Sequence, residues 1–242
     1  MAEFALVDAT TWIGGYDFTG DLNQVQLQVS ADELDSTTFG SGGFRKRIGG
    51  LRSVQASLAG FWSSATSAAP DPHVMPDLGV ADRVVTMTPD GAEGSVAYFF
   101  QGAKFSTQMF GQIGEVTPFS VDVMGSNKVG LVRGQVLKAK GTVNATGATG
   151  SALELGEVAD GQWLYAAFHV FSAGTTITAV LESDEDDDFA DATTRATFGP
   201  ITTTGGVWAA RVAGPITDEW YRLRVSAVTG TFQIAGAAGI GS

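Results

Sequence analysis

The densest group of ionisable side chains lies in the second half of the chain, where six carboxylates occur within seven residues. The run is Glu182-Ser183-Asp184-Glu185-Asp186-Asp187-Asp188. Carboxylate oxygens are the ligands that calcium prefers, but the spacing does not match an EF-hand loop and no glycine lies at the centre. Blocks of like charge usually stay solvated. The run therefore favours an exposed loop between strands, with a calcium site as the alternative.

The other side chains capable of acid–base or nucleophilic chemistry form no recognisable catalytic group. His73 follows Asp71 by two residues, but no G-x-S-x-G serine and no cysteine accompanies this pair. His169 lies in an aromatic segment, where a structural histidine is the better interpretation. No carboxylate pair is aimed by strand alternation at one cleft, as a glycosidase requires. The glycines at 40–43 lack the lysine and helix of a phosphate loop. We expect no enzymatic activity, no metal and no cofactor.

An aromatic and basic group in the last third of the chain has the composition of a carbohydrate-binding platform, although core packing explains the aromatics equally well. Its members are Trp163, Trp208, Trp220, Tyr221, Arg222 and Arg224. Sugar recognition by this region is the alternative function.

Composition indicates an all-β protein with a real core. Of 242 residues, 44% are hydrophobic and 32 are glycine, about twice the usual share. Threonine and valine are abundant, which is typical of short strands joined by tight turns. Asp71-Pro72 has the pattern of a helix start, so one short helix is expected there, limited by Pro76.

Charge and hydropathy exclude two classes of partner. The formal net charge is −12, with 14 acids and 10 bases up to Lys140 and 12 acids and 4 bases after it. Neither half offers the basic surface that nucleic-acid binding requires. The first residues lack a signal-peptide pattern, and no apolar run reaches the length of a membrane span. We expect synthesis in a cytoplasm and no contact with a membrane.

Two alternating segments surround an unusually long connection. Val25, Leu27 and Val29 alternate with glutamines, and Val54, Ala56 and Leu58 alternate with small polar residues, as in strands with one buried face. The polar positions are Gln24, Gln26, Gln28, Ser53, Gln55 and Ser57. About twenty residues lie between the segments, whereas a hairpin needs two to five.

This connection, which we call the arm (residues 31–50), has the composition of a contact surface. It carries acids at its start, aromatic and aliphatic residues in the middle and bases towards its end. These residues are Asp32, Glu33, Asp35, Phe39, Phe44, Arg45, Lys46, Arg47 and Ile48. Grouped exposed apolar side chains usually mark an interface, and the two signs of charge suit head-to-tail assembly of identical subunits. A merely flexible surface loop is the alternative.

The pattern of strands predicts two domains. Residues 1–140 contain about seven predicted strands, which suits a sandwich or partial barrel. Residues 141–152 are small and without apolar periodicity, as in a linker. Residues 153–242 contain six or so further strands and are expected to form a second, smaller β-sandwich of immunoglobulin-like type.

Three segments of the first 140 residues resemble the major tail (tail tube) proteins of long-tailed bacteriophages. They are GDLNQVQLQVSADELDSTTFG, RKRIGGLRSVQASLAGFW and EVTPFSVDV, in that order. The resemblance implies a β-sandwich with a long hairpin loop and one short helix. It also implies hexameric rings whose sheets join into an inner barrel, and ring-on-ring stacking through extended loops.

The same resemblance implies a location and partners. The protein is expected in the virion tail, bound to copies of itself and to other phage tail proteins at the tube ends, while DNA passes without specific binding. The polar positions at 24, 26, 28, 53, 55 and 57 are candidates for the lumen wall, although an ordinary solvent face fits them as well. The C-terminal part resembles an added outer domain. The alternative is a virion decoration or tail-tip protein whose C-terminal sandwich recognises a host-surface carbohydrate.

Overall fold

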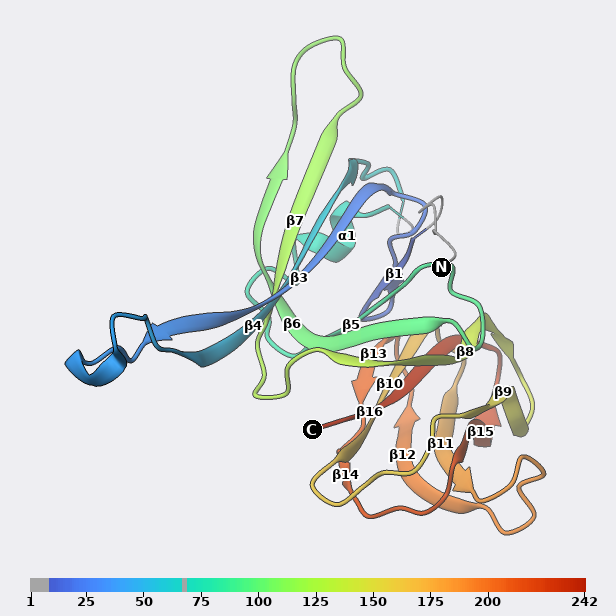
Figure 1. Cartoon of the computed structure of the whole chain (residues 1–242). Coiled ribbons are helices and arrows are strands. Elements are labelled where there is room, and N and C mark those ends of the chain that lie inside the picture. Colours follow the sequence, from blue (N-terminus) through green and yellow to red (C-terminus); the bar gives the residue numbers. More distant parts are fainter. Residues whose placement is uncertain (1–8, 67–68) are drawn as a thin grey trace. The chain divides into compact units, whose positions relative to one another are not determined.

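The computed structural model describes residues 9–66 and 69–242, and within them the backbone is almost wholly β (Figure 1). The one α-helix of this part is α1 (Asp71–Val74), and a single 3-10 turn, η1 (Phe39–Ser41), lies in the arm. The prediction of an all-β protein with one short helix is confirmed. No helix in the described residues is long and apolar enough to cross a membrane.

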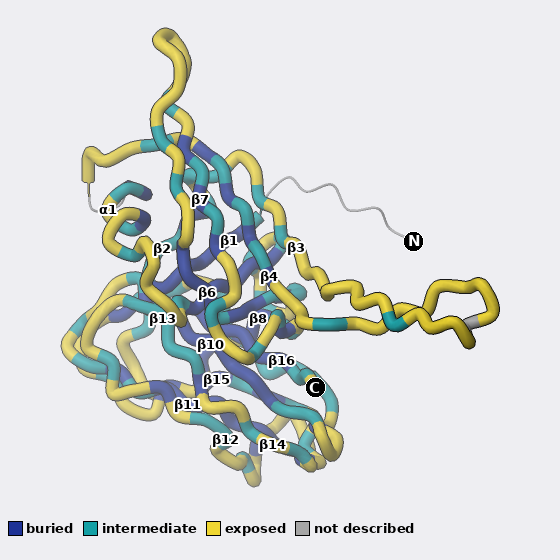
Figure 2. The backbone as a smooth tube through the Cα atoms, turned by 90° about the vertical axis from the view of Figure 1, so that its left-hand side faces the viewer, coloured by how far each residue is buried: buried dark blue, intermediate teal, exposed yellow. Residues whose placement is uncertain are grey.

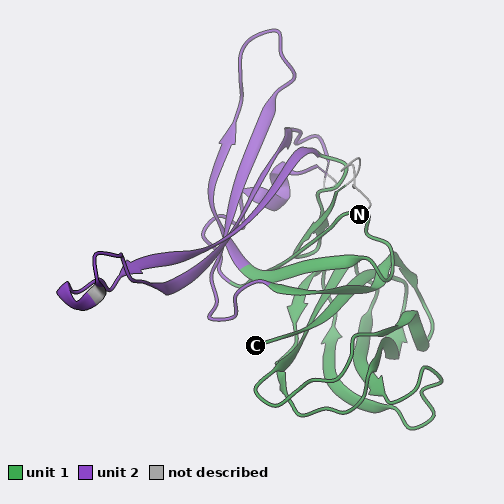
Figure 3. Ribbon diagram, in the orientation of Figure 1, with its two compact units in different colours: residues 1–21, 82–101, 132–242 green, residues 22–81, 102–131 purple. Residues whose placement is uncertain are grey.

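The chain forms two compact units, drawn in different colours in Figure 3. Unit 1 comprises residues 1–21, 82–101 and 132–242, and unit 2 comprises residues 22–81 and 102–131. These units do not follow the predicted division at residue 140, and the predicted linker contains the end of β8 and most of β9. Whether residues 1–140 and 153–242 fold separately stays a prediction.

Unit 1 contains most of the strands. They are β1 (Thr10–Ile13), β2 (Tyr16–Asp17), β5 (Arg83–Thr88), β8 (Val132–Val143), β9 (Gly147–Glu154), β10 (Trp163–Ser172), β11 (Thr176–Asp184), β12 (Thr193–Ile201), β13 (Gly205–Trp208), β14 (Val212–Ala213), β15 (Trp220–Thr229) and β16 (Phe232–Gly241). Strand β6 (Val96–Met109) begins in this unit and ends in unit 2.

The C-terminal part of unit 1 is a β-sandwich. One sheet has the order β13-β10-β16-β8, and the facing sheet has the order β12-β11-β15-β9. Alternate residues of both sheets point into a shared core, where Phe168 stacks on Phe198 with ring centroids 5.1 Å apart. Leu181 and Leu223, from the second sheet, are fully buried in the same core. A sandwich is therefore present in the C-terminal part of the chain, and it includes β8 and most of β9, which lie before residue 153.

The other face of β10 is buried as well, which explains why this strand is apolar on both sides. His169 is fully buried there: its Nδ1 lies 2.8 Å from the Gly14 carbonyl oxygen, and its Nε2 lies 2.8 Å from Thr86 Oγ1. The Trp12 ring packs beside it. His169 is thus the structural histidine that the sequence indicates.

Unit 2 is built on one four-stranded antiparallel sheet. Its strands are β3 (Leu22–Asp35), β4 (Arg47–Phe61), β7 (Pro118–Gly125) and the second half of β6, in that order. One face is apolar, and its central residues are buried: Val54, Ala56, Leu58, Phe119, Val121 and Val123. The alternation predicted for β3 and β4 is confirmed in β4, whose polar positions are only partly covered.

Helix α1 starts where predicted, but its aspartate does not cap it. Asp71 lies inside the first turn, followed by Pro72, and the N-cap position is Pro70. The Asp71 carboxylate instead accepts a hydrogen bond of 3.2 Å from the indole N–H of Trp62. The helix ends after one turn, before Pro76, because a proline cannot donate the next helical hydrogen bond.

Burial of His169 makes the stability of the fold depend on pH. Burial lowers the pKa of His169 to about 4, below the ordinary value near 6.5 that applies to the unfolded chain. The unfolded chain therefore binds more protons between these values, and stability falls as pH falls through this window. We expect a loss of about 3 kcal/mol between pH 7 and pH 4 from this residue.

Urea unfolding of the wild-type chain and of His169→Gln at both pH values measures the effect. The wild type should lose about 3 kcal/mol more than the variant, because glutamine does not titrate. Equal losses in the two proteins would contradict this account of His169.

Candidate assembly surface of unit 2

The arm is an extension of the β3–β4 hairpin. The two strands stay paired as far as Asp35 and Arg47, with an irregularity after Ala31. The connecting loop is therefore residues 36–46, much shorter than the twenty or so residues inferred from alternation. Alternation ends early because this part of the ribbon is exposed on both faces, so neither face is selected for apolar residues (Figure 2).

Strand pairing brings the acidic and basic ends of the arm together within one chain. Glu33 and Arg47 form an ion pair of 2.6 Å, with both side chains at least half exposed. Asp35 accepts a hydrogen bond from the Thr37 N–H, and hydrogen bonds from Thr37 hold the pKa of the Asp35 carboxyl below its usual range. An exposed pair of this kind contributes little stability. Its effect is to fix the ribbon's shape.

The apolar side chains of the arm are exposed. Phe39 and Phe44, at the tip, are 111% and 82% exposed. Leu34 and Ile48 are cross-strand partners on one face of the ribbon, and each is about half exposed. Of the predicted contact residues, Asp32, Arg45 and Lys46 are also exposed. Their role in contacts between subunits stays a prediction.

Unit 2 has a second projecting hairpin, which the sequence analysis did not identify. The loop between β6 and β7, residues 110–117, exposes Phe110, Ile113 and Val116. The glycines at positions 111 and 114 indicate a turn. The overlooked signal is the set of apolar residues around these glycines.

The polar positions of β3 and β4 lie on one face of the unit 2 sheet. Gln26 is paired with Ser57, Gln28 with Gln55 and Ser30 with Ser53, while Gln24 is paired with Ala59. The same rows continue across β7 and β6: Ser57 lies opposite Asp122, and Asp122 lies opposite Ser106. We call this surface the polar face. Its lumen position stays a prediction.

Asp122 joins three strands on the polar face. Its carboxylate accepts hydrogen bonds from the hydroxyls of Ser57, at 2.6 Å, and Ser106, at 2.8 Å. These hydrogen bonds, first that of Ser57, hold the pKa of the Asp122 carboxyl below its usual range. The central row of the polar face therefore carries a fixed negative charge between neutral hydroxyl and amide groups. Alternation in β7 indicated this face, but the sequence analysis did not connect it to Gln26 and Ser57.

The two edges of the unit 2 sheet run in opposite directions. Each strand is antiparallel to its neighbour, so β3 at one edge and β6 at the other point in opposite directions. In the described residues of unit 2, β3 pairs only with β4. Residues 102–109 of β6 pair with β7, and Lys104 also forms a bridge with Leu78. Unpaired edge strands offer backbone donors and acceptors to another strand.

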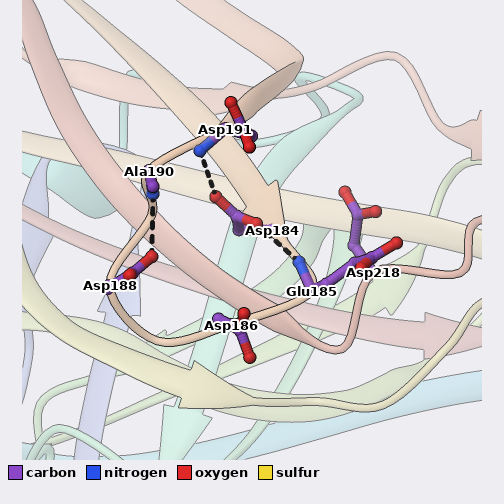
Figure 4. Close-up of a pocket in the computed structure, with 7 residues that line it drawn as sticks. All are labelled: Asp184, Glu185, Asp186, Asp188, Ala190, Asp191 and Asp218. Atoms are coloured by element: carbon purple, nitrogen blue, oxygen red, sulfur yellow. Dashed lines mark hydrogen bonds between the residues drawn. The ribbon is translucent and has the colours of Figure 1, made fainter.

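The acidic run spans the end of β11 and the loop after it. Glu182, Ser183 and Asp184 are buried strand residues, so the expected exposed loop is limited to residues 185–188. Part of the run lines a hollow of about 290 Å³ (Figure 4). Its carboxylates are hydrogen-bonded to the loop's own backbone: Asp184 accepts from the N–H groups of Glu185 and Asp191, and Asp188 accepts from that of Ala190. Among the described residues, no three acidic or histidine side chains are placed to hold a metal ion. The calcium alternative stays a hypothesis.

The predicted aromatic platform is divided between two sheets. Trp163 and Trp208 lie on the first sheet of unit 1, on the face away from the sandwich core; Trp208 packs against Tyr165 with ring centroids 6.3 Å apart. Trp220 lies on β15, in the other sheet. Tyr221 is fully buried in the core, and Arg222 and Arg224 pair with Glu182. The structure does not bring these residues into one platform.

His73 and Asp71 also form no dyad in the structure. The Asp71 carboxylate is bound to Trp62, and the His73 carbonyl oxygen accepts a hydrogen bond from Lys104.

No family model and no curated protein matches the chain. Among solved structures, it is similar to a chain in the tail of an empty gene transfer agent particle with C6 symmetry, at 17% identity over 54% of this chain and 97% of that one, with a TM-score of 0.40. The SPP1 Dit protein, from the hub adsorption apparatus of phages that infect Gram-positive bacteria, gives 9% identity over 97% and 99%, with a TM-score of 0.38. A chain of the phage p2 baseplate gives 8% identity over 94% and 97%, with a TM-score of 0.34. These scores are too low to establish a common fold.

The Asp122 cluster should contribute measurably to stability. Asp122→Ala removes the acceptor of two hydroxyl hydrogen bonds, and we expect a loss of about 1 kcal/mol in the free energy of unfolding. Asp122→Asn keeps one acceptor oxygen and should lose less. Ser120→Ala, on the same strand and face, is the matched control. Urea unfolding checks the order, and an Asp122→Ala protein as stable as the control would contradict it.

The acidic loop should not respond to calcium. Its carboxylates already accept backbone hydrogen bonds, so millimolar calcium is expected to leave Tm unchanged, to within about 1 °C. Thermal unfolding with and without calcium is the measurement. A calcium-dependent rise in Tm that is absent in Asp186→Asn would show that the loop binds the ion.

Proposed function

We propose that this chain is a structural protein of a phage virion, and that its copies assemble as stacked hexameric rings into the tail tube through which DNA is ejected. The observation that carries the proposal is the unit 2 sheet, with edges of opposite direction at β3 and β6 and one polar face. The ordered resemblance of residues 20–40, 45–62 and 115–123 to tail tube proteins points the same way.

Ring closure follows from the strand directions. Because β3 and β6 run in opposite directions, β6 of one copy meets β3 of the next copy as an antiparallel pair. Rotating one copy about the ring axis therefore continues the antiparallel order of strands from copy to copy. A closed barrel removes every edge of the sheet, whereas a single copy keeps β3 and the end of β6 as edges.

The polar face suits the wall of a channel for DNA. Its rows carry neutral amides and hydroxyls around Asp122, and no arginine or lysine contributes to the rows named above. Phosphate groups are bound mainly by Lys and Arg, so this face offers DNA no binding site. Passage without specific binding is the behaviour that a conduit requires.

The arm supplies the second contact. Its exposed apolar tip and its projection from the sheet suit a contact with an adjacent subunit or ring. At the two ends of the tube, the same surfaces are proposed to meet other phage tail proteins. The proposed location is the virion tail, after synthesis in the host cytoplasm.

Negative-stain electron microscopy of the purified chain over a range of concentrations tests the proposal. Rings or tubes of uniform diameter are expected above a threshold concentration. A strictly monomeric protein at every concentration and salt would overturn the proposed function.

Removing the apolar tip of the arm should separate folding from assembly. Phe39→Ser with Phe44→Ser replaces two exposed side chains, so Tm should change by less than about 2 °C. Ring or tube formation should be lost or need at least about tenfold more protein, because the tip no longer buries apolar surface. Lys128→Ser, in an exposed loop of the same unit, is the control. Assembly of the arm variant at the wild-type concentration would contradict this role.

A further inference from the structure

The segment that follows α1 lies against the open edge of β6. Leu78 forms a parallel bridge with Lys104, and the N–H of Gly79 donates a 2.7 Å hydrogen bond to the Lys104 carbonyl oxygen. Lys104 is paired with Val123 of β7 on its other side. The edge of β6 is therefore already occupied at Lys104.

The side chain of Lys104 holds this segment in place. It is 1% exposed, and its Nζ lies 3.3 Å from the Asp77 carboxylate and also donates to the His73 carbonyl oxygen. A buried ammonium group is costly unless it is paired and hydrogen-bonded. Both partners lie in residues 73–77, directly before the bridge at Leu78. The lysine thus ties α1 and the segment after it to β6.

Occupation at Lys104 limits where another strand can be added. Within unit 2, residues 105–109 of β6 have β7 as their strand partner, and the bridge to Leu78 ends at Lys104. A strand added to this edge has five residues of free backbone before it meets Gly79. Since Ser106 and Gln108 point to the polar face, a strand with the alternation of β3 would continue that face.

We propose that the segment Asp77–Gly79, held by Lys104, is a register stop for β3 of a second copy. The inference rests on the proposed ring assembly. A slip of one residue would turn the polar face of the added strand outwards. A slip of two residues would keep the face but displace each copy by roughly 7 Å along the strand, which prevents closure of a flat ring.

Exposed apolar residues beside the stop give the added strand a place to pack. Leu78, Val80 and Phe105 are 43%, 39% and 54% exposed. On β3, Leu27 is partly exposed and belongs to the apolar side of the strand. Across the sheet Leu27 shares a row with Lys104, so Leu27 of the next copy would reach the level of Lys104 and the stop.

Cysteine cross-linking between copies tests the register, because the natural chain contains no cysteine. One cysteine replaces Gln108 on β6, and a second replaces Gln24, Gln26 or Gln28 on β3, one at a time. Each protein is oxidised under ring-forming conditions and its disulfide-linked oligomers are counted on a denaturing gel. The three pairs are then repeated with Lys104→Met, Lys104→Arg and, as the matched control, Lys128→Met.

With Lys104 present, one β3 position should cross-link at least about tenfold more than the other two, because a disulfide tolerates little variation in distance. Lys104→Met should spread the cross-links over several positions, whereas Lys104→Arg and Lys128→Met should keep one. If Lys104→Met does not fold, Asp77→Asn gives the same comparison. A single preferred position that survives both Lys104→Met and Asp77→Asn overturns the register stop. If the protein that keeps Lys104 forms no rings and no cross-links at all, that result overturns the proposed function instead.

Discussion

Unpaired backbone groups at the two edges of the unit 2 sheet are the constraint on which the other features of the molecule depend. A strand edge exposes a row of N–H and C=O groups that pair readily with another strand. Here the edge strand β3 is 14 residues long, and its continuation forms the arm. The opposite edge, at β6, meets Leu78 and Gly79 at Lys104. In the proposed ring, a neighbouring copy would pair with each of the two edges.

The two units differ in charge and in the apolar surface that they expose. Unit 1 buries its own core between two complete sheets and carries 19 acidic and 8 basic residues. Unit 2 carries seven acidic and six basic residues and leaves its apolar tips and sheet edges exposed. Unit 1 is therefore the more acidic unit. The rows of the polar face named above contain no cationic group, which is the property that the proposed channel wall requires.

Local patterns in the sequence predict much of the fold, because period-two alternation records burial directly. The strands around Val25 and Val54, the helix at Asp71 and the central position of β10 follow from such patterns. The length of the β3–β4 ribbon does not, because a ribbon exposed on both faces has no alternation to record. Strand alternation assigns residues to the two faces of one strand, but it does not predict which strands share a sheet. It therefore gives no sign that Trp163 and Trp220 lie on different sheets.

The parts of the candidate assembly surface that the sequence did not predict depend on contacts between residues far apart in the chain. In the sequence, Lys104 has the pattern of a solvated lysine. Its burial depends on pairing with Asp77 and the His73 carbonyl group, and no spacing rule connects these residues to it. The row from Gln26 to Ser106 depends on the pairing of two hairpins, β3–β4 and β6–β7, that are far apart in the chain. The second hairpin has a local signal in Phe110, Ile113 and Val116, which lie on either side of its glycines.

Hydrogen exchange of the β3 amides tests most directly whether copies complete one another's sheets. The N–H groups of residues 22–31 that face away from β4 should exchange rapidly in dilute monomer and at least about tenfold more slowly in assembled rings, while the amides of β11 in the unit 1 core keep one rate in both. Rings in which those β3 amides exchange as fast as in the monomer would contradict the account.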